Sequence, residues 1–535
     1  MDRLKIDLKY NKGYSWYIEN NFYFKGYVFD NEQSLEGRSA VKYIKESIYQ
    51  NNDIEIAVSK LNGIFSLIYK SYDQLIICVD RVRTFPLFYS AKNERIIISD
   101  DAEACLDETI RTNKSAKEEF QYTGYVTGDN TLIEDVSQVQ AGELVYLTPQ
   151  SRSSIFYHEY LQKNDPADQV GTDKLSLSKV FTDISHRLKN SLKGKTPVIP
   201  LSGGYDSRLI AVMLKERGVE DAVCFTYGRK DNPEIDISRK VARSLGYKWH
   251  FIEYTPELIK GYIQDDDFKE YYRYSSNHTS MFYMQEYFAV RELKKLIPAN
   301  SVFIPGHSGD FFGGSHLDKQ IALSKTENEI VDHIIRKHFV LMRVKNDRKN
   351  RLKKRIKHQI SGKNDNVNYS YFENWDLKER QAKFVVNSSR IYEHFGFQHL
   401  LPLMDNELMD FFAKTNLKQK MNKILYNKVI VNGIFHKYDL NFTNEIQAKR
   451  KDIRIQKLKE TVKKILPSKI VDKYKYKLNR IGDTYYYIEI TDLMKKELMS
   501  KNINIDVSGR DKNSIIVQWY LHKLETRGKC INLNL

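Results

Sequence analysis

Two short polar segments, each following an apolar run, contain the residues of this chain best suited to phosphate chemistry. The first follows the run at 198–201 and contains Ser202, Gly203, Gly204, Asp206 and Ser207. Glycines lack a Cβ atom, so backbone N–H groups can approach an anion closely, and the start of a following helix favours phosphate. A carboxylate beside phosphates is typical of a site in which Mg²⁺ lies between them. We therefore predict a phosphate-binding loop, against the alternative of an ordinary strand-to-helix turn with a helix cap.

The second segment, FIPGHSGDFFGG at 303–314, places Asp310 among glycines after another apolar run. Ligands of an open parallel sheet bind beyond the carboxyl ends of its strands, so residues that follow different strands meet there. A carboxylate at Asp310 is therefore expected to reach the same metal ion as Asp206. We predict these two residues as the Mg²⁺ ligands.

The elements expected to position these residues change in character along the chain. Short apolar runs separated by turn residues predict strands over the first 150 or so residues. The polar stretch QKNDPADQVGTD at 162–173 predicts a linker. Beyond it, strand-like and helix-like segments alternate, which favours a parallel sheet covered by helices on both faces, and from Thr326 onward the pattern is mostly helical. We predict domains at 1–165 and 170–535.

Composition limits the class of protein. A chain of 535 residues with 41% hydrophobic residues favours two or three packed domains. No window approaches the roughly 18 consecutive apolar residues of a membrane span, and the first residues lack the apolar core of a signal peptide, so we expect a cytoplasmic protein without a membrane span. The four cysteines lie far apart without metal or redox spacing, which predicts a reducing compartment and no structural zinc.

The net charge suggests polyanionic partners as a further possibility. The net charge of +16, with a pI near 9.2, would suit nucleic acid or an acidic membrane surface. Ten Lys or Arg residues and one Asp occur between Arg343 and Lys363, and a second basic stretch runs from Lys449 to Lys477. Few aromatic residues for base stacking are interleaved with them, so solvated helix faces are the favoured interpretation and nucleic acid is not an expected partner.

Longer motifs add a family resemblance. The string S-G-G-x-D-S at 202–207 resembles the pyrophosphate-binding loop of ATP pyrophosphatases, and 303–314 resembles the G-x-G-x-D-E-x-F-G-G segment of the asparagine synthetase family. LPLMDNELMDFF at 401–412 and KILYNKVI at 423–430 resemble later segments of that family. The first half contains LNGIFSLIYKSYDQLIICVDRVRTFPLFYS at 61–90, which resembles the class II glutamine amidotransferase signature. The resemblance implies an α+β Ntn-hydrolase-like sandwich domain, then an α/β doubly wound parallel-sheet ATP-pyrophosphatase domain with a helical C-terminal extension.

The resemblance also implies roles for single residues. The ATP and pyrophosphate site that it implies consists of Leu201, Ser202, Gly203, Gly204, Asp206, Ser207, Arg208, Tyr227, Gly228 and Gly306, with adenine near Tyr227 and Gly228. The catalytic candidates are His307, Glu379, Lys449 and Lys451. A histidine at 307 could take a proton from an amine nucleophile because its ordinary pKa is near neutral, and the alternative is a polar loop residue. For the two lysines the alternative is a solvated basic helix.

Departures from the family pattern matter for function. The family's glutaminase nucleophile is a cysteine directly after the initiator methionine, whereas Asp2 stands here and no cysteine precedes Cys78. The family's substrate loop N-G-E-I-Y-N appears as KGYVFD at 25–30, and a carboxylate cannot replace a thiolate in thioester chemistry. We therefore predict an amidotransferase fold that does not hydrolyse glutamine. A misassigned start that hides a cysteine is the alternative.

These observations together predict an ATP-dependent amide-forming ligase that uses ATP and Mg²⁺. A carboxylate would be adenylated, with release of pyrophosphate, and an amine or ammonia would then attack. Asparagine biosynthesis is the reaction that the family name suggests. The alternatives are intramolecular amide formation, as in β-lactam synthetases and lasso-peptide cyclases, a tRNA-modifying ATP pyrophosphatase, and a catalytically silent scaffold. A homodimer is left open.

Overall fold

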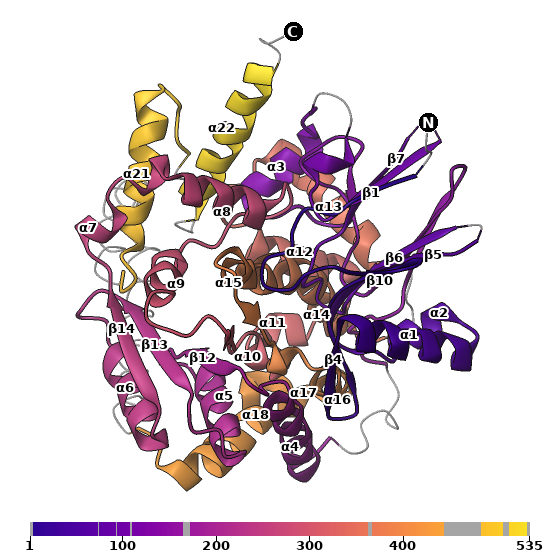
Figure 1. Ribbon diagram of the computed structural model, residues 1–535. Helices are drawn as coiled ribbons and strands as arrows, with labels where there is room; N and C mark the ends of the chain where they lie inside the picture. The colour runs from indigo at the N-terminus through magenta and orange to yellow at the C-terminus, as the bar shows by residue number, and fades with distance from the viewer. Residues whose placement is uncertain are drawn as a thin grey trace.

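The computed structural model describes residues 4–72, 74–92, 94–106, 110–163, 172–361, 366–442, 483–506 and 513–531. Within these ranges the strands form three sheets, two in the first 160 residues and one in the rest of the chain (Figure 1). The segment at 202–207 follows strand β12 (Thr196–Pro200) of the third sheet, and the segment at 303–314 begins at the last residue of its strand β15 (Ser301–Phe303).

The first 160 residues form two sheets that pack face to face. Their strands are β1 Leu4–Asp7, β2 Tyr17–Glu19, β3 Phe22–Asp30, β4 Gln33–Glu36, β5 Asn62–Lys70, β6 Leu75–Val79, β7 Phe88–Lys92, β8 Arg95–Ser99, β9 Ser137–Gln138, β10 Glu143–Leu147 and β11 Arg152–Phe156. The smaller sheet has the order β1-β8-β7-β9, and the larger has the order β11-β10-β6-β5-β3-β2 with β4 paired to β3. Helices α1 Gly37–Asn51, α2 Ile54–Ser59 and α3 Lys114–Thr123 complete this half.

Side-chain alternation along β5 explains why the larger sheet is covered on both faces. Phe65 and Leu67 point to one face, where they pack with Val41 and other apolar residues of α1. Ile68 points to the opposite face and packs with Ile98 of the smaller sheet. Successive residues of a strand face opposite sides, so a run that is apolar at every position requires cover on both sides.

The third sheet is parallel throughout and has the order β14-β13-β12-β15-β16. Its strands are β12 Thr196–Pro200, β13 Val223–Gly228, β14 Lys248–Glu253, β15 Ser301–Phe303 and β16 Gln398–His399. From β12 the chain builds outward through β13 and β14 and then returns to place β15 on the other side of β12. Open parallel sheets bind ligands at such a switch point. The parallel sheet predicted from the alternating pattern is therefore present.

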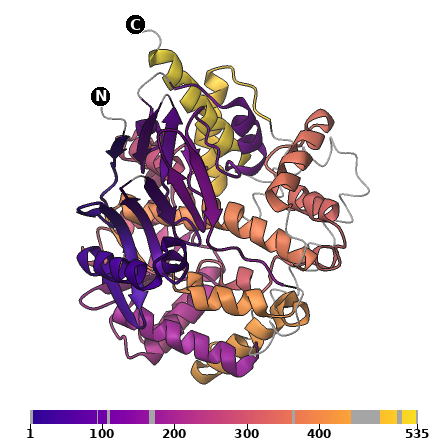
Figure 2. The same cartoon turned by 90° about the vertical axis from the view of Figure 1, so that its right-hand side faces the viewer.

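Helices flank this sheet and form most of the remaining chain (Figures 1 and 2). Up to residue 322 they are α4 Lys174–Asn190, α5 Tyr205–Glu216, α6 Glu234–Leu245, α7 Pro256–Ile259, α8 Asp266–Ser276, α9 Tyr287–Leu293, α10 Gly309–Phe312 and α11 Lys319–Ala322. Beyond residue 326 they are α12 Glu327–His338, α13 Asn346–Ile360, α14 Asn368–Asp376, α15 Arg390–His394, α16 Asn406–Lys414, α17 Leu417–Lys420, α18 Ile424–Val429, α21 Tyr487–Ser500 and α22 Ser514–Ile531. A π-helical segment, η4 at Leu377–Val385, continues α14. The two-residue strand β16 interrupts this mostly helical region.

Apolar side chains from both halves of the chain share one core. Tyr14 and Phe85 from the first half belong to the same buried cluster as Leu209 of α5. Phe120 of α3 packs against Tyr520 of α22 with ring centroids 5.9 Å apart, and the two helices lie side by side in both views (Figures 1 and 2). The first half is thus packed against the rest of the chain through two apolar clusters.

Candidate active site at the switch point of the parallel sheet

The loop that follows β12 is held in shape by its own serine hydroxyls. The Ser202 hydroxyl accepts a hydrogen bond from the Gly204 N–H at 3.1 Å, and the Ser207 hydroxyl accepts one from the Ser202 N–H at 3.2 Å. The two hydroxyl oxygens are 3.1 Å apart. Gly204 precedes the first residue of α5 in extended conformation, so the first N–H groups of a twelve-residue helix face the loop. These groups make the loop a suitable phosphate site.

The loop that follows β15 lies against this first loop. A Cβ atom on Gly306 would stand only 2.5 Å from the Ser207 nitrogen, so the approach requires glycine at this position. The Asp310 N–H donates a hydrogen bond of 2.8 Å to Oδ2 of Asp206. The structure therefore places the two residues predicted as metal ligands next to each other.

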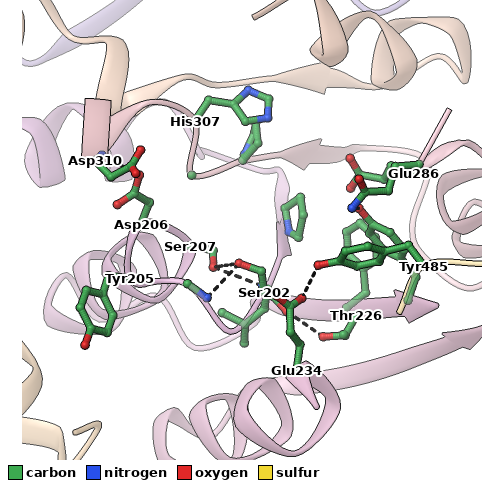
Figure 3. A pocket seen from close by; sticks show the side chains of 18 of the residues that line it. Ser202, Tyr205, Asp206, Ser207, Thr226, Glu234, Glu286, His307, Asp310 and Tyr485 are labelled. Carbon is green, nitrogen blue, oxygen red and sulfur yellow. Dashed lines mark hydrogen bonds between the residues drawn. The ribbon is translucent and has the colours of Figure 1, made fainter. Parts of the chain in front are cut away.

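A cavity of about 420 Å³ opens beside the two loops (Figure 3). Its lining comprises Pro200, Leu201, Ser202, Gly204, Tyr205, Asp206, Ser207, Phe225, Thr226, Tyr227, Glu234, Tyr283, Gln285, Glu286, Pro305, Gly306, His307, Asp310, Tyr392, Lys423 and Tyr485. Figure 3 shows Asp206 and Asp310 on one side of this cavity and Glu286 and Tyr485 on the opposite side. We call it the loop cavity. Nine of the residues predicted for the site line it.

Asp206 is the most perturbed of the predicted ligands. Burial and the neighbouring Asp310 carboxylate raise the pKa of Asp206 to about 7. The hydroxyl of Tyr426 in α18 donates to its Oδ1 at 2.7 Å and opposes that shift. Two carboxylates held this close repel each other unless a proton or a cation lies between them. The pair is therefore chemically suited to bind a divalent cation.

Lys423 supplies a positive charge that the sequence prediction did not include. It lines the loop cavity immediately before α18. Lys423 and its neighbour Asn422 both have left-handed backbone, with φ of 58° and 55°. Side chains larger than glycine adopt that conformation at a cost, and such strain gathers at functional sites. The segment KILYNKVI, which contains both Lys423 and Tyr426, was the available signal.

Three residues predicted for the ATP site lie outside the cavity lining. Arg208 is fully buried on the other side of α5, where its guanidinium donates to the carbonyl oxygens of Leu440 at 2.7 Å and Gly203 at 3.3 Å. Gly203 itself packs against α6. Gly228 has a φ of +118°, and a Cβ there would meet the Thr484 carbonyl at 2.4 Å. These residues shape the loop and its surroundings rather than face the cavity.

His307 lines the cavity, but its surroundings favour the neutral imidazole. Burial, together with the nearby His399, lowers the pKa of His307 to about 4. Its Nδ1 lies 3.5 Å from the Ser389 hydroxyl. An imidazole with so low a pKa accepts a proton weakly at neutral pH. The role of His307 as a base stays a prediction.

The remaining catalytic candidates do not meet at this cavity in the described residues. Glu379 is buried, and its carboxylate accepts from Lys383 at 2.7 Å and from the Gly128 N–H at 2.9 Å. Glu379 lines a different cleft together with Lys378, whereas Arg380 and Gln381 of η4 line a separate cavity, which is described next. Lys449 and Lys451 lie outside the described residues.

A second cavity, of about 410 Å³, shares Asp310 with the loop cavity. Lys337 and Arg380 bring positive charge to it, and Asp376 brings negative charge. The Asp376 carboxylate accepts from Gln381 at 3.0 Å and lies 3.4 Å from the His338 ring. Burial opposes ionisation of Asp376, but His338 and Arg380 lower its pKa. A cavity with both signs of charge suits a small polar molecule that carries both.

In the first half, Lys25 of the altered substrate loop is used in a contact between the two halves. Its ammonium lies 3.2 Å from the carboxylate of Glu393 in α15, and both side chains are at most 3% exposed. Its Nζ also donates to the Tyr10 carbonyl at 3.1 Å and lies over the Phe85 ring. Asp2 lies outside the described residues.

Comparison with protein families gives two matches. The chain matches the asparagine synthase family over residues 188–514, which is more than half of its length. The chain belongs to the asparagine synthase family. A second match, to the glutamine amidotransferase domain, covers residues 47–160. Family membership confirms the resemblance predicted from 202–207 and 303–314, and it indicates an ATP-dependent ligase enzyme.

Individual relatives match over short stretches. The chain is 30% identical over 102 residues to a probable glutamine-hydrolysing asparagine synthetase of Acanthamoeba polyphaga mimivirus, a stretch that is 18% of each chain. It is 35% identical over 65 residues, 12% of this chain, to the 7-cyano-7-deazaguanine synthase of Lysinibacillus sphaericus strain C3-41, and it spans 30% of that protein. Among solved structures, the glutamine phosphoribosylpyrophosphate amidotransferase of B. subtilis is 10% identical, with 54% of this chain and 63% of that chain covered and a TM-score of 0.18.

No group of three or more His, Cys, Asp or Glu side chains in the described residues is arranged to hold a metal ion. None of the helices described is both long and apolar enough to cross a membrane.

Proposed function

We propose that this asparagine synthase family member is an amide-forming ligase that adenylates a carboxylate with ATP and passes the acyl group to an amine or ammonia. One observation carries the proposal. Asp206 lies in the first turn of α5 and Asp310 in the first turn of α10, after the adjacent parallel strands β12 and β15. The Asp310 N–H donates a hydrogen bond of 2.8 Å to Oδ2 of Asp206. A phosphate-binding helix start and a pair of carboxylates in one cavity are what an adenylating enzyme needs.

Three parts of the loop cavity have a task in this reaction. The Gly204 region and Ser207 would bind the phosphates through N–H and hydroxyl groups, while Lys423 would balance the charge that develops on the leaving pyrophosphate. Donors aimed at developing charge lower the barrier more than donors that bind the ground state. The carboxylate substrate would attack the α-phosphorus, the bond to the β-phosphate oxygen would break, and an acyl-adenylate and pyrophosphate would form.

The residues present fit Mg²⁺. This ion is usually held by one or two protein carboxylates together with substrate phosphates, so a cluster of three protein ligands is not required. Asp206 and Asp310 would hold it, and their mutual repulsion, which raises the pKa of Asp206, would be relieved. When bound, Mg²⁺ supplies charge neutralisation at the phosphates.

The second cavity is our proposed place for the carboxylate substrate. It meets the loop cavity at Asp310, so a molecule there can reach the α-phosphate end of ATP. Arg380 and Lys337 would bind a further anionic group, and Asp376 would bind an amino group. Amino acids have both groups.

We also propose that the first half does not hydrolyse glutamine, because the ammonium of Lys25, in the altered substrate loop, already forms an ion pair with Glu393.

Pyrophosphate release from Mg-ATP tests the proposal. The protein is assayed with a panel of amino acids and other carboxylates, each with ammonia, glutamine or other amines. Asp206→Asn and Asp310→Asn should lower release at least about 100-fold, because several kcal/mol of charge stabilisation is lost. Asp236→Asn, at an exposed carboxylate of α6, is the matched control and should be unchanged. Failure of the wild-type protein to bind ATP would refute the proposal.

A further inference from the structure

The side of the loop cavity opposite the two carboxylates has a distinct chemistry. Figure 3 shows Glu286 and Tyr485 there, across the cavity from Asp206 and Asp310. Tyr227, Tyr283 and Tyr485 line this side and remain partly exposed to the cavity. Partly exposed aromatic rings are suited to stacking on a flat heterocycle. If the phosphates of ATP lie at the carboxylates, its base lies among these tyrosines.

Glu286 is the unexplained group on this side. Its side chain is 5% exposed, and its carboxyl extends toward the cavity in Figure 3. The Tyr392 hydroxyl donates to Oε2 at 3.2 Å, whereas Oε1 has no hydrogen-bond partner. A buried carboxyl oxygen without a partner is costly, so a ligand that supplies one is favoured.

Tyrosines surround this acid. The groups that share an electrostatic interaction with Glu286 are the tyrosines Tyr227, Tyr254, Tyr271, Tyr283, Tyr392 and Tyr485. Burial raises the pKa of Glu286 to about 8, against the hydrogen bond from Tyr392, which lowers it. The raised pKa favours the protonated carboxyl group, which can both donate and accept a hydrogen bond.

Adenine presents a hydrogen-bond acceptor beside a hydrogen-bond donor, which complement the donor and acceptor of a protonated carboxyl group. Its edges place a ring-nitrogen acceptor beside the amino donor, and side chains that offer one donor and one acceptor side by side bind it in bidentate fashion. A protonated carboxyl offers the same pair, with the O–H on one oxygen and the second oxygen as acceptor. Tyr392 occupies only one lone pair of Oε2, which leaves another for the amino group.

We propose that Glu286 is the base-specificity residue of this enzyme and reads the adenine edge of ATP as a neutral carboxylic acid. The proposal rests on the proposed function, because it requires ATP in the loop cavity. It adds side-chain recognition of the base to the phosphate and metal contacts already described. Gln285, whose amide donates to the Tyr227 hydroxyl at 3.5 Å, would hold one of the stacking rings.

Nucleotide binding, measured by calorimetry with the full chain and Mg²⁺, tests the proposal. The two ligands are ATP and purine riboside triphosphate, which lacks the amino group. The wild-type protein should bind ATP at least about 10-fold more tightly, since a bidentate pair discriminates bases by about 5- to 150-fold. Glu286→Leu should bind the two ligands equally. The ratio of the dissociation constants for the two ligands does not depend on how much of the variant is folded.

ATP affinity measured at several pH values distinguishes a neutral Glu286 side chain from an ionised one. Because the group loses its proton through about pH 8, ATP binding by the wild-type protein should weaken about 10-fold between pH 7 and pH 9. Glu286→Gln keeps one donor and one acceptor at every pH, so it should lose this 10-fold weakening and keep only the smaller change that comes from Asp206, whose pKa is about 7. Equal ATP binding by wild type and Glu286→Leu, with a raised KM for the amine, would overturn the proposal and assign Glu286 to the amine instead. Absence of ATP binding in all proteins would refute the proposed function itself.

Discussion

A single methyl group at Gly306 should disable the active site. The Cβ of Gly306→Ala would stand 2.5 Å from the Ser207 nitrogen and 2.7 Å from the Asp206 carbonyl carbon. Ordinary contacts begin near 3.4 Å, so the two loops must separate by about 0.9 Å. Both contacts are with backbone, so no side-chain rotation relieves them. A misplacement of about 1 Å can cost about 100-fold in rate, which is the loss expected in pyrophosphate release.

Gly433→Ala is the matched control for this prediction. A Cβ on Gly433 meets nothing within 4 Å, and the residue does not have positive φ. The rate of pyrophosphate release by Gly433→Ala should therefore stay within about twofold of wild type. Thermal unfolding should show that both variants fold, with Gly306→Ala destabilised by about 1–3 kcal/mol through overpacking. A folded Gly306→Ala protein with wild-type pyrophosphate release would refute the argument that close contact of the two loops aligns the site.

Two further predictions concern buried or strained cations. Lys423→Met should lower the rate of pyrophosphate release at least about 10-fold with little effect on the unfolding temperature, whereas Lys428→Met, at an exposed lysine of the same helix, should change neither. Lys25→Met should destabilise the protein by about 3–5 kcal/mol, because it removes the cation that lies 3.2 Å from the buried Glu393 carboxylate. The double variant Lys25→Met, Glu393→Met should recover most of that loss in thermal unfolding, and a double variant no more stable than the single one would contradict this account.

The site residues that could be predicted from the sequence stand close together in the chain or follow neighbouring strands. Ser202 and Asp206 stand in one short string, and the parallel sheet that follows from alternating elements brings Asp310 to the same edge. Arg208, predicted for the ATP site from the same string, is not part of the cavity lining, because successive helical residues point about 100° apart. When Ser207 faces the loop, the next side chain turns into the core.

The residues that the sequence prediction missed depend on tertiary packing. Tyr426 reaches Asp206 across 220 residues of sequence, and Glu286 enters the cavity from the segment before α9. No spacing rule links such distant positions. The strand β16 was missed for a different reason, since two residues are too short to give an alternating pattern.

The apolar packing between the two halves has a consequence for synthesis of the chain. The hydroxyl of Tyr14 donates to the carbonyl of His399, 385 residues later. At about 5–20 residues per second, the ribosome needs about 20–80 s to make the partner of that contact. During this interval the aromatic face formed by Tyr14, Tyr27 and Phe85 has no second half to cover it. The first half is therefore the segment most in need of a chaperone while the chain is still growing.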